Sequence, residues 1–130
     1  MVKTPVTAVQ MLVRLTGLIL IVLGLSFWTG HALGLIPVHK QIGYLFVLAL
    51  WTEAVFAARA GVAPGFVALA VLWGLVVAFL GMTQDRLLIG NAHWIIKLLH
   101  LLVGLAAIGQ GEGLAARAKE EQRTPAFSGR

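Results

Sequence analysis

Four long apolar stretches follow one another along the chain, separated by short polar or turn-forming segments. They cover residues 9–29, 38–59, 64–82 and 92–110. An α-helix rises ~1.5 Å per residue, so a stretch of about 20 residues can cross the ~30 Å hydrocarbon core of a bilayer. The pattern predicts an all-α fold, an integral membrane four-helix bundle with up-down-up-down topology.

The four stretches leave little sequence for a second domain. We expect residues 1–111 to form a four-span transmembrane domain. Residues 112–130 mix Ala, Lys, Glu and Arg and are expected to form a cytoplasmic tail, amphipathic at first and disordered at its end.

Composition excludes several classes of protein. Of the 130 residues, 59% are hydrophobic and only 12% are charged, whereas a soluble domain has about one-quarter charged residues. The chain has no cysteine, which excludes disulfides, thiolate metal sites and iron–sulfur clusters. The net charge of +5 is interpreted relative to the membrane, and we expect no nucleic-acid partner.

The basic residues are distributed unevenly between the two predicted membrane sides. One side carries Lys40 and Arg86, and the other carries Lys3, Arg59, Arg117, Lys119, Arg123 and Arg130. By the positive-inside rule, both termini are expected to be cytoplasmic in a multi-pass protein of a bacterial-type inner (cytoplasmic) membrane.

Arg14 and Glu53 lie inside the first two predicted spans. An ionisable group in hydrocarbon costs at least ~2.5 kcal/mol on insertion scales, so each needs a structural or functional reason. Their predicted depths agree within roughly one helical turn. The sequence favours an Arg14–Glu53 ion pair that fixes helix register, with a proton or quinone contact at Glu53 as the alternative.

Glycines recur at seven-residue spacing on two of the spans. Gly17 and Gly24 share one face of the first span, and Gly74 and Gly81 share one face of the third. Small residues let membrane helices approach closely, so helix packing is the expected role of these positions.

All four histidines fall in the predicted outer half of the bundle. His93, Lys97 and His100 stand at positions i, i+4 and i+7, which is one face of the fourth span and too polar for lipid. His31 lies at the end of the first span, and His39 near the start of the second. Neutral imidazole binds haem iron, zinc, copper or nickel.

Bundle geometry favours His39 and His93 as a ligand pair. The second and fourth spans are expected to be diagonal and parallel, with these two histidines at equal depth. Helix axes ~8–10 Å apart give a diagonal of roughly 11–14 Å, which suits two axial ligands of one b-type haem. Lys40 and Arg86 would neutralise its propionates. His100, ~10 Å deeper, is the substitute ligand if the fourth span is rotated or begins earlier.

The four spans and their interior histidines loosely resemble the small four-helix b-type cytochromes of bacterial inner membranes, a group that includes quinone-coupled superoxide-oxidising members. The resemblance implies electron transport with quinone as a partner. Such proteins usually hold two haems through histidine pairs near both membrane faces. The inner half of this chain has no histidine, so the resemblance implies one outer haem.

Three function classes remain open. The first is an electron-transfer haem protein, which would be a quinone-linked oxidoreductase or its subunit. The second is a non-haem metal-binding or transport element for zinc, copper or nickel, built from His39, His93 and His100 with His31 and Asp85. The third is a structural subunit of a larger respiratory or photosynthetic complex, or of a homo-oligomer. No hydrolase nucleophile motif, Walker loop or nucleotide fingerprint is present.

Overall fold

The computed structural model describes residues 3–124 and is all-α over that range. Its elements are α1 (Lys3–Trp28), η1 (Leu33–Leu35), α2 (Ile36–Ala60), α3 (Pro64–Thr83), η2 (Gln84–Arg86) and α4 (His93–Glu121). Each of the four α-helices is long and apolar enough to cross a membrane, as the hydrophobic pattern predicts. Residues 1–2 and 125–130, which include Arg130 and the end of the predicted tail, lie outside the described residues.

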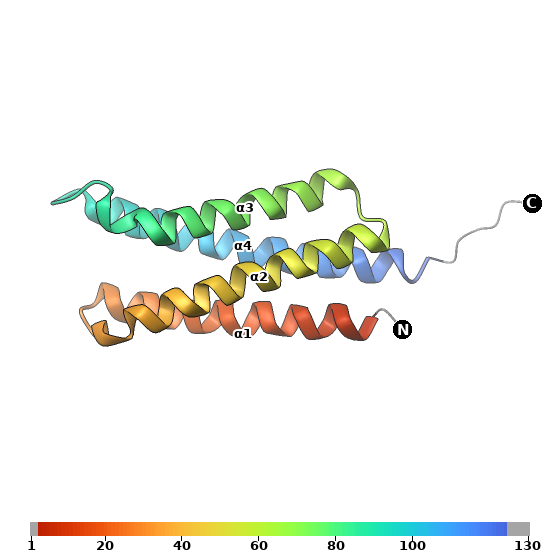
Figure 1. Ribbon diagram of the computed structural model, residues 1–130, viewed down its shortest axis with the longest axis horizontal. Helices are drawn as coiled ribbons and strands as arrows, with labels where there is room; N and C mark the ends of the chain where they lie inside the picture. The colour runs from red at the N-terminus through yellow and green to blue at the C-terminus, as the bar shows by residue number, and fades with distance from the viewer. Residues whose placement is uncertain (1–2, 125–130) are drawn as a thin grey trace, which may run out of the picture.

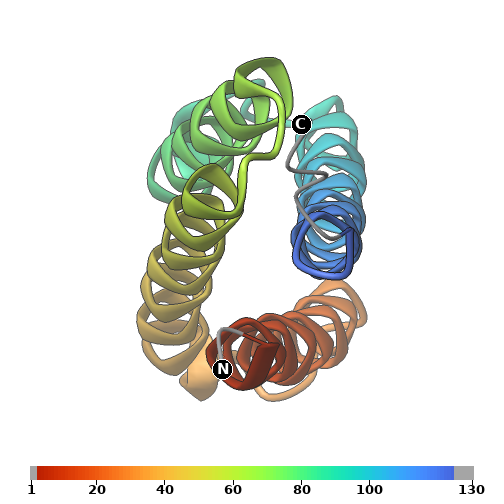
Figure 2. The ribbon, with the colours of Figure 1, turned by 90° about the vertical axis from the view of Figure 1, so that its right-hand side faces the viewer.

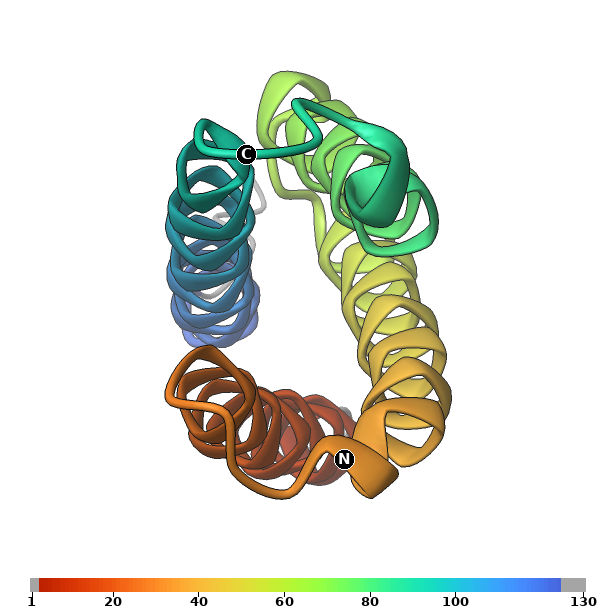
Figure 3. The ribbon, with the colours of Figure 1, turned by 90° about the vertical axis from the view of Figure 1, so that its left-hand side faces the viewer.

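The helices form a bundle in which α1 and α3 occupy opposite corners (Figure 2 and Figure 3). The start of α1 and the end of α4 lie at one end, called the terminal end below (Figure 1). The η1 and η2 connections lie at the other, called the connection end. Helices α2 and α4 each contact all three other helices, so they hold the two corner helices together.

Proline and glycine set the helix boundaries around α2. Pro37 lies in the first turn of α2, and Pro64 is the first residue of α3, positions where the missing N–H costs no hydrogen bond. Gly61 ends α2 with φ 95°, and the N–H of Val62 donates to the carbonyl of Ala57. This left-handed cap turns the chain directly into α3.

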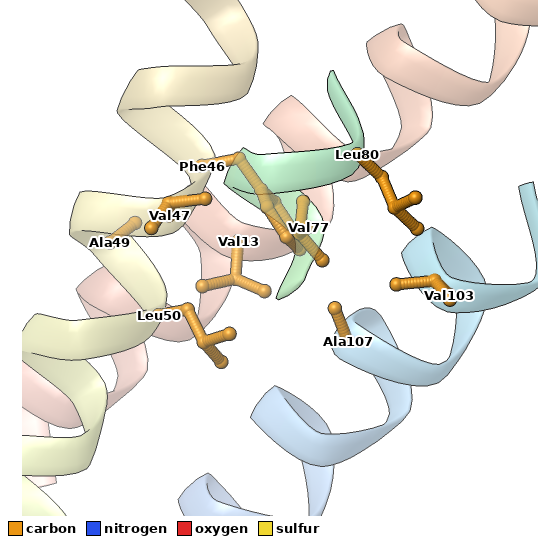
Figure 4. Close-up of a cluster of buried hydrophobic side chains, with 9 residues drawn as sticks. All are labelled: Val13, Phe46, Val47, Ala49, Leu50, Val77, Leu80, Val103 and Ala107. Carbon is orange, nitrogen blue, oxygen red and sulfur yellow. The ribbon is translucent and has the colours of Figure 1, made fainter. Parts of the chain in front are cut away.

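A buried apolar layer crosses the middle of the bundle (Figure 4). Its centre consists of Val13 from α1, Phe46 and Leu50 from α2, and Ala107 from α4, all at most 2% exposed. We call these four residues the apolar layer. A second cluster continues toward the terminal end and comprises Val6, Ala54, Ala57, Val62, Ala70, Leu114, Ala115 and Ala118.

Helix α4 is longer than the apolar pattern predicts. The predicted span ends at residue 110, whereas α4 continues without a break to Glu121. Leu114, Ala115 and Ala118 stay buried on one face of this extension, while charged residues occupy the other faces. The first part of the predicted tail is therefore the last turns of α4.

The prediction that Arg14 pairs with Glu53 is wrong. The Nε and Nη2 atoms of Arg14 lie 2.5 and 2.7 Å from the two carboxylate oxygens of Glu112. The extension of α4 places Glu112 beside α1, which the predicted helix end did not allow. Glu53 is buried, and neither of its carboxyl oxygens has a hydrogen-bond partner in the described part of the chain.

Arg14 and Glu112 should therefore be energetically coupled. Arg14→Leu leaves the Glu112 carboxylate without its bidentate partner, and Glu112→Leu strands the guanidinium, so each change should lower the unfolding midpoint in detergent. The double variant should be more stable than the sum of the two losses implies. Additive losses in this double-mutant cycle would contradict the pairing.

Gly74 should not tolerate a side chain. A Cβ at position 74 would overlap the indole ring of Trp51, whose Nε1 donates to the Val71 carbonyl at 3.2 Å. We expect Gly74→Ala to cost about 1–3 kcal/mol through overpacking. Gly65→Ala is the matched control, because nothing lies within 4 Å of a Cβ there. Equal unfolding midpoints for the two variants would contradict the packing described.

Candidate functional site

A cavity of about 360 Å³ opens between the helices in the half of the bundle nearer the connection end. This volume lies within the range of small-molecule sites, roughly 300–1,000 Å³. Its lining runs from Leu33 and Asp85 in the connections down to Gly17 and Ile108. Most of the lining is apolar. The ionisable side chains that line it are His39, Lys40, Tyr44, Asp85, His93, Lys97 and His100.

His39 and His100 face each other inside this cavity. Their ring centroids lie 6.4 Å apart with an interplanar angle of 57°. The Nδ1 atom of each ring is buried and has no hydrogen-bond partner within residues 3–124. Phe27 packs edge-on against His39, with 5.4 Å between ring centroids. Buried polar atoms are normally satisfied, so these two imidazole nitrogens in one cavity are candidate ligand-binding groups.

Glycines keep the space beside both histidines open. A Cβ at Gly24 would stand 3.7 Å from Cε1 of His39, and one at Gly81 would stand 3.8 Å from Cε1 of His100. Any longer side chain at either position would extend over the imidazole. Gly43 and Gly104 also line the cavity and have nothing within 4 Å of a Cβ.

The glycines on α1 and α3 thus have two roles. The predicted packing role fits Gly17, where a Cβ would come within 2.9 Å of Ile108, and Gly74 under Trp51. Gly17, Gly24 and Gly81 all line the cavity, but at Gly24 and Gly81 a Cβ would meet only an imidazole carbon at ordinary contact distance, so close helix packing does not require glycine there. Seven-residue spacing alone could not separate the two roles.

The structure places His39 beside His100 and not beside His93, the expected partner. His93 lines the same cavity, but its Nδ1 lies 3.1 Å from the Leu87 carbonyl. His39 is three residues into α2, whereas His100 is seven residues into α4. Because these two rings lie side by side, the first residue of α4 lies roughly 6 Å farther toward the connection end than the first residue of α2. The expectation of equal depth for His39 and His93 overlooked this offset.

The other predicted site residues divide into two groups. Lys40 lines the cavity, and its Nζ lies 3.7 Å from Oδ2 of Asp85. The Asp85 carboxylate therefore has a lysine ammonium as its neighbour. Arg86 is exposed and does not line the cavity. His31 is exposed outside the cavity, with its Nδ1 3.1 Å from the Thr29 hydroxyl.

Lys97 is a site residue that the predicted set left out. It lines the cavity between His93 and His100 and makes no hydrogen bond or ion pair among the residues described. The signal was present in the i, i+4, i+7 pattern of these three residues, which puts all of them on one face of α4.

The number of side chains that could bind a metal in the cavity determines which metal it suits. Residues 3–124 contain no group of three or more His, Cys, Asp or Glu side chains that could hold a metal ion. Structural zinc sites take four protein ligands, and catalytic ones take three. Haem iron takes only its axial ligands from the protein, and two imidazoles complete that set. His39 and His100 therefore fit haem iron better than a bare zinc, copper or nickel ion.

Comparison of the chain with protein-family models, with curated proteins and with solved structures gave no match.

Proposed function

We propose that this chain is a membrane-embedded electron-transfer protein that binds one b-type haem between His39 and His100. The supporting observation is the spacing of the two imidazole rings, 6.4 Å between centroids, together with their orphaned nitrogens. An imidazole nitrogen binds a metal at about 2 Å, which puts the ring centroid roughly 3 Å from the metal. Two imidazoles on opposite sides of one metal thus have centroids roughly 6 Å apart.

Other cavity residues suit a flat, partly anionic ligand. Gly24 and Gly81 leave the edges of the two imidazoles uncovered. Lys97 has no partner among residues 3–124, and Lys40 has only a long contact to Asp85. Both ammonium groups line the cavity, where they can pair with carboxylates such as haem propionates.

When bound, a b-type haem would supply one-electron transfer, and His39 and His100 would hold its iron. The chain's own contribution is to fix the two imidazoles, one on α2 and one on α4, at a constant distance from each other. Its largely apolar cavity walls limit the access of water. Quinone is the electron partner that the resemblance implies, and the Lys40 and Asp85 end of the cavity is where an outer-side partner could approach.

The proposed setting is a bacterial-type inner membrane with up-down-up-down topology and both termini in the cytoplasm. The terminal end carries Arg59, Arg117, Lys119 and Arg123, whereas the connection end carries Lys40, Arg86 and Lys97. Such an excess of basic residues favours the cytoplasmic side.

Haem binding is tested by the visible spectrum of the protein purified from haem-sufficient cells. We expect a Soret band and the spectrum of six-coordinate, low-spin haem b. His39→Ala and His100→Ala should each abolish or convert this spectrum, because each removes an axial ligand. Gly81→Leu should reduce haem content by filling the space beside His100.

Two histidines serve as matched controls for these variants. His93→Ala and His31→Ala should keep the low-spin spectrum, because their rings contact Leu87 and Thr29. Protein without a Soret band that also fails to take up added haem would overturn the proposal. If this protein contains zinc, copper or nickel that the His39→Ala variant lacks, a metal-binding element is favoured. If it contains no metal, a structural subunit is favoured.

The membrane orientation is tested separately with reporter fusions. Fusions after Arg130 and within the connection near Asp85 should report opposite sides, with Arg130 in the cytoplasm. Finding both on the same side would contradict the four-span topology.

A further inference from the structure

Glu53 is a second unusual polar group, remote from the cavity. Its side chain is 1% exposed, and neither carboxyl oxygen has a hydrogen-bond partner within residues 3–124. It lies seven residues before Ala60, about 10 Å inside the terminal end of α2. An unpaired carboxylate at such a place would lose its hydration without compensation, so the neutral acid is the form that this environment favours.

The packing around Glu53 leaves room for its carboxyl group and little else. A Cβ at Gly111 of α4 would stand 2.9 Å from Oε2 of Glu53 and 3.0 Å from Cγ1 of Val13. Glycine at position 111 is what admits the carboxyl between α1 and α4. Helix α3 contributes no ionisable residue anywhere along its length.

The charged residues that follow Val13 and Gly111 in the sequence form an ion pair with each other. Arg14 follows Val13 on α1, and Glu112 follows Gly111 on α4, but these two form the bidentate pair. On α2 itself the nearest charged residue is Arg59, which is exposed at the helix end. Glu53 therefore has charged groups close by in the fold, and none of them bonds to it.

A chain of hydrogen bonds links this region to the terminal end. Nζ of Lys119 lies 2.5 Å from Oε1 of Gln10, and Nε2 of Gln10 donates to Oε2 of Glu112 at 2.7 Å. Lys119 is seven residues beyond Glu112 on α4, which is roughly 10 Å nearer the terminal end. Polar groups thus run from the terminal end to the residue that adjoins Gly111.

Between Glu53 and the histidine cavity, the bundle is filled by apolar side chains. His39, Phe46, Leu50 and Glu53 lie on one face of α2 at helical spacing, so Phe46 and Leu50 stand between the cavity and Glu53. Val13 and Ala107 complete the apolar layer from α1 and α4. His39 and Glu53 are separated by 14 residues, roughly 21 Å along the helix.

We infer that Glu53 is a proton-binding site that is loaded from the terminal end through Glu112, which Gln10 holds in place by a hydrogen bond, and that it is isolated from the histidine cavity by the apolar layer. In the exchange step, the O–H bond of the Glu53 acid breaks and its proton passes through a water molecule to a Glu112 carboxylate oxygen, which forms an O–H bond as it releases its hydrogen bond from Arg14. The charge of the two carboxyls together stays at one negative unit throughout. Arg14 compensates that charge.

The test is infrared spectroscopy of the full chain in lipid nanodiscs at neutral pH. We expect the carbonyl band of one protonated carboxylic acid, which Glu53→Gln should remove. Glu120→Gln is the matched control, since Glu120 is exposed on α4, and should leave the band intact. No such band, or a band that persists in Glu53→Gln, would overturn the inference.

A second measurement on the unsubstituted chain covers the case in which Glu53→Gln fails to fold. The protein has only four glutamates, at positions 53, 112, 120 and 121, so carboxyl-labelled glutamate gives few signals in solid-state NMR. The signal in contact with Gly111 should have the chemical shift of a neutral acid at neutral pH. The shift of an ionised carboxylate there would contradict the site.

The route of access is tested by the rate at which the infrared band shifts after transfer to D2O. Gln10→Leu should slow the exchange several-fold, because it removes the hydrogen bond that positions the Glu112 carboxylate for the transfer. Gly81→Leu, which alters only the cavity, should leave the rate unchanged. Slower exchange in Gly81→Leu with no effect of Gln10→Leu would place the access on the cavity side and overturn the proposed route.

Discussion

The apolar layer of Val13, Phe46, Leu50 and Ala107 is the contact on which the rest of this bundle depends. It brings α1, α2 and α4 together at the middle of their length, and every polar group inside the bundle lies on one side of it or the other. Toward the connection end the helices leave a cavity lined by His39, His93 and His100, and toward the terminal end they bury the carboxyl of Glu53 and the side chain of Gln10. We infer from the close packing of this layer that the cavity and the Glu53 region do not exchange protons with each other.

Most of the architecture follows from the apolar pattern. Four stretches of sufficient length predict four helices, and Pro37 and Pro64 mark helix starts for a local reason. The end of α4 could not be predicted from hydropathy, because Glu112 and the charged residues after it lower the average. The signal for the extension was the spacing of small and apolar residues at 111, 114, 115 and 118, which keeps one face of α4 buried.

That one boundary determined which ion pair was predicted. With the fourth span ending at residue 110, Glu53 was the obvious partner for Arg14 in the predicted bundle. Once α4 continues, Glu112 presents a carboxylate to Arg14 from a neighbouring helix, and a second carboxyl has no cation left to pair with. The number of residues from each helix end predicts how deep Arg14 and Glu53 lie in the membrane. It does not predict which of two nearby carboxylates pairs with Arg14.

The candidate site was predictable as a set of residues and not as a pair. The gathering of the histidines toward one end and the i, i+4, i+7 stripe on α4 both follow from spacing. The pairing of His39 with His100 depends on where α2 and α4 begin relative to each other, which connection geometry determines. Likewise, only the packed structure separates glycines beside an imidazole, such as Gly24, from one beneath a tryptophan, such as Gly74.

The proposed function requires His39 and His100 to bind the same iron atom. An anomalous-scattering map, recorded at the iron edge from crystals of the haem-loaded protein, tests this directly. We expect a single iron peak between the His39 and His100 rings, on the connection side of Phe46. An iron peak at His93 or His31, or two peaks in one chain, would contradict it.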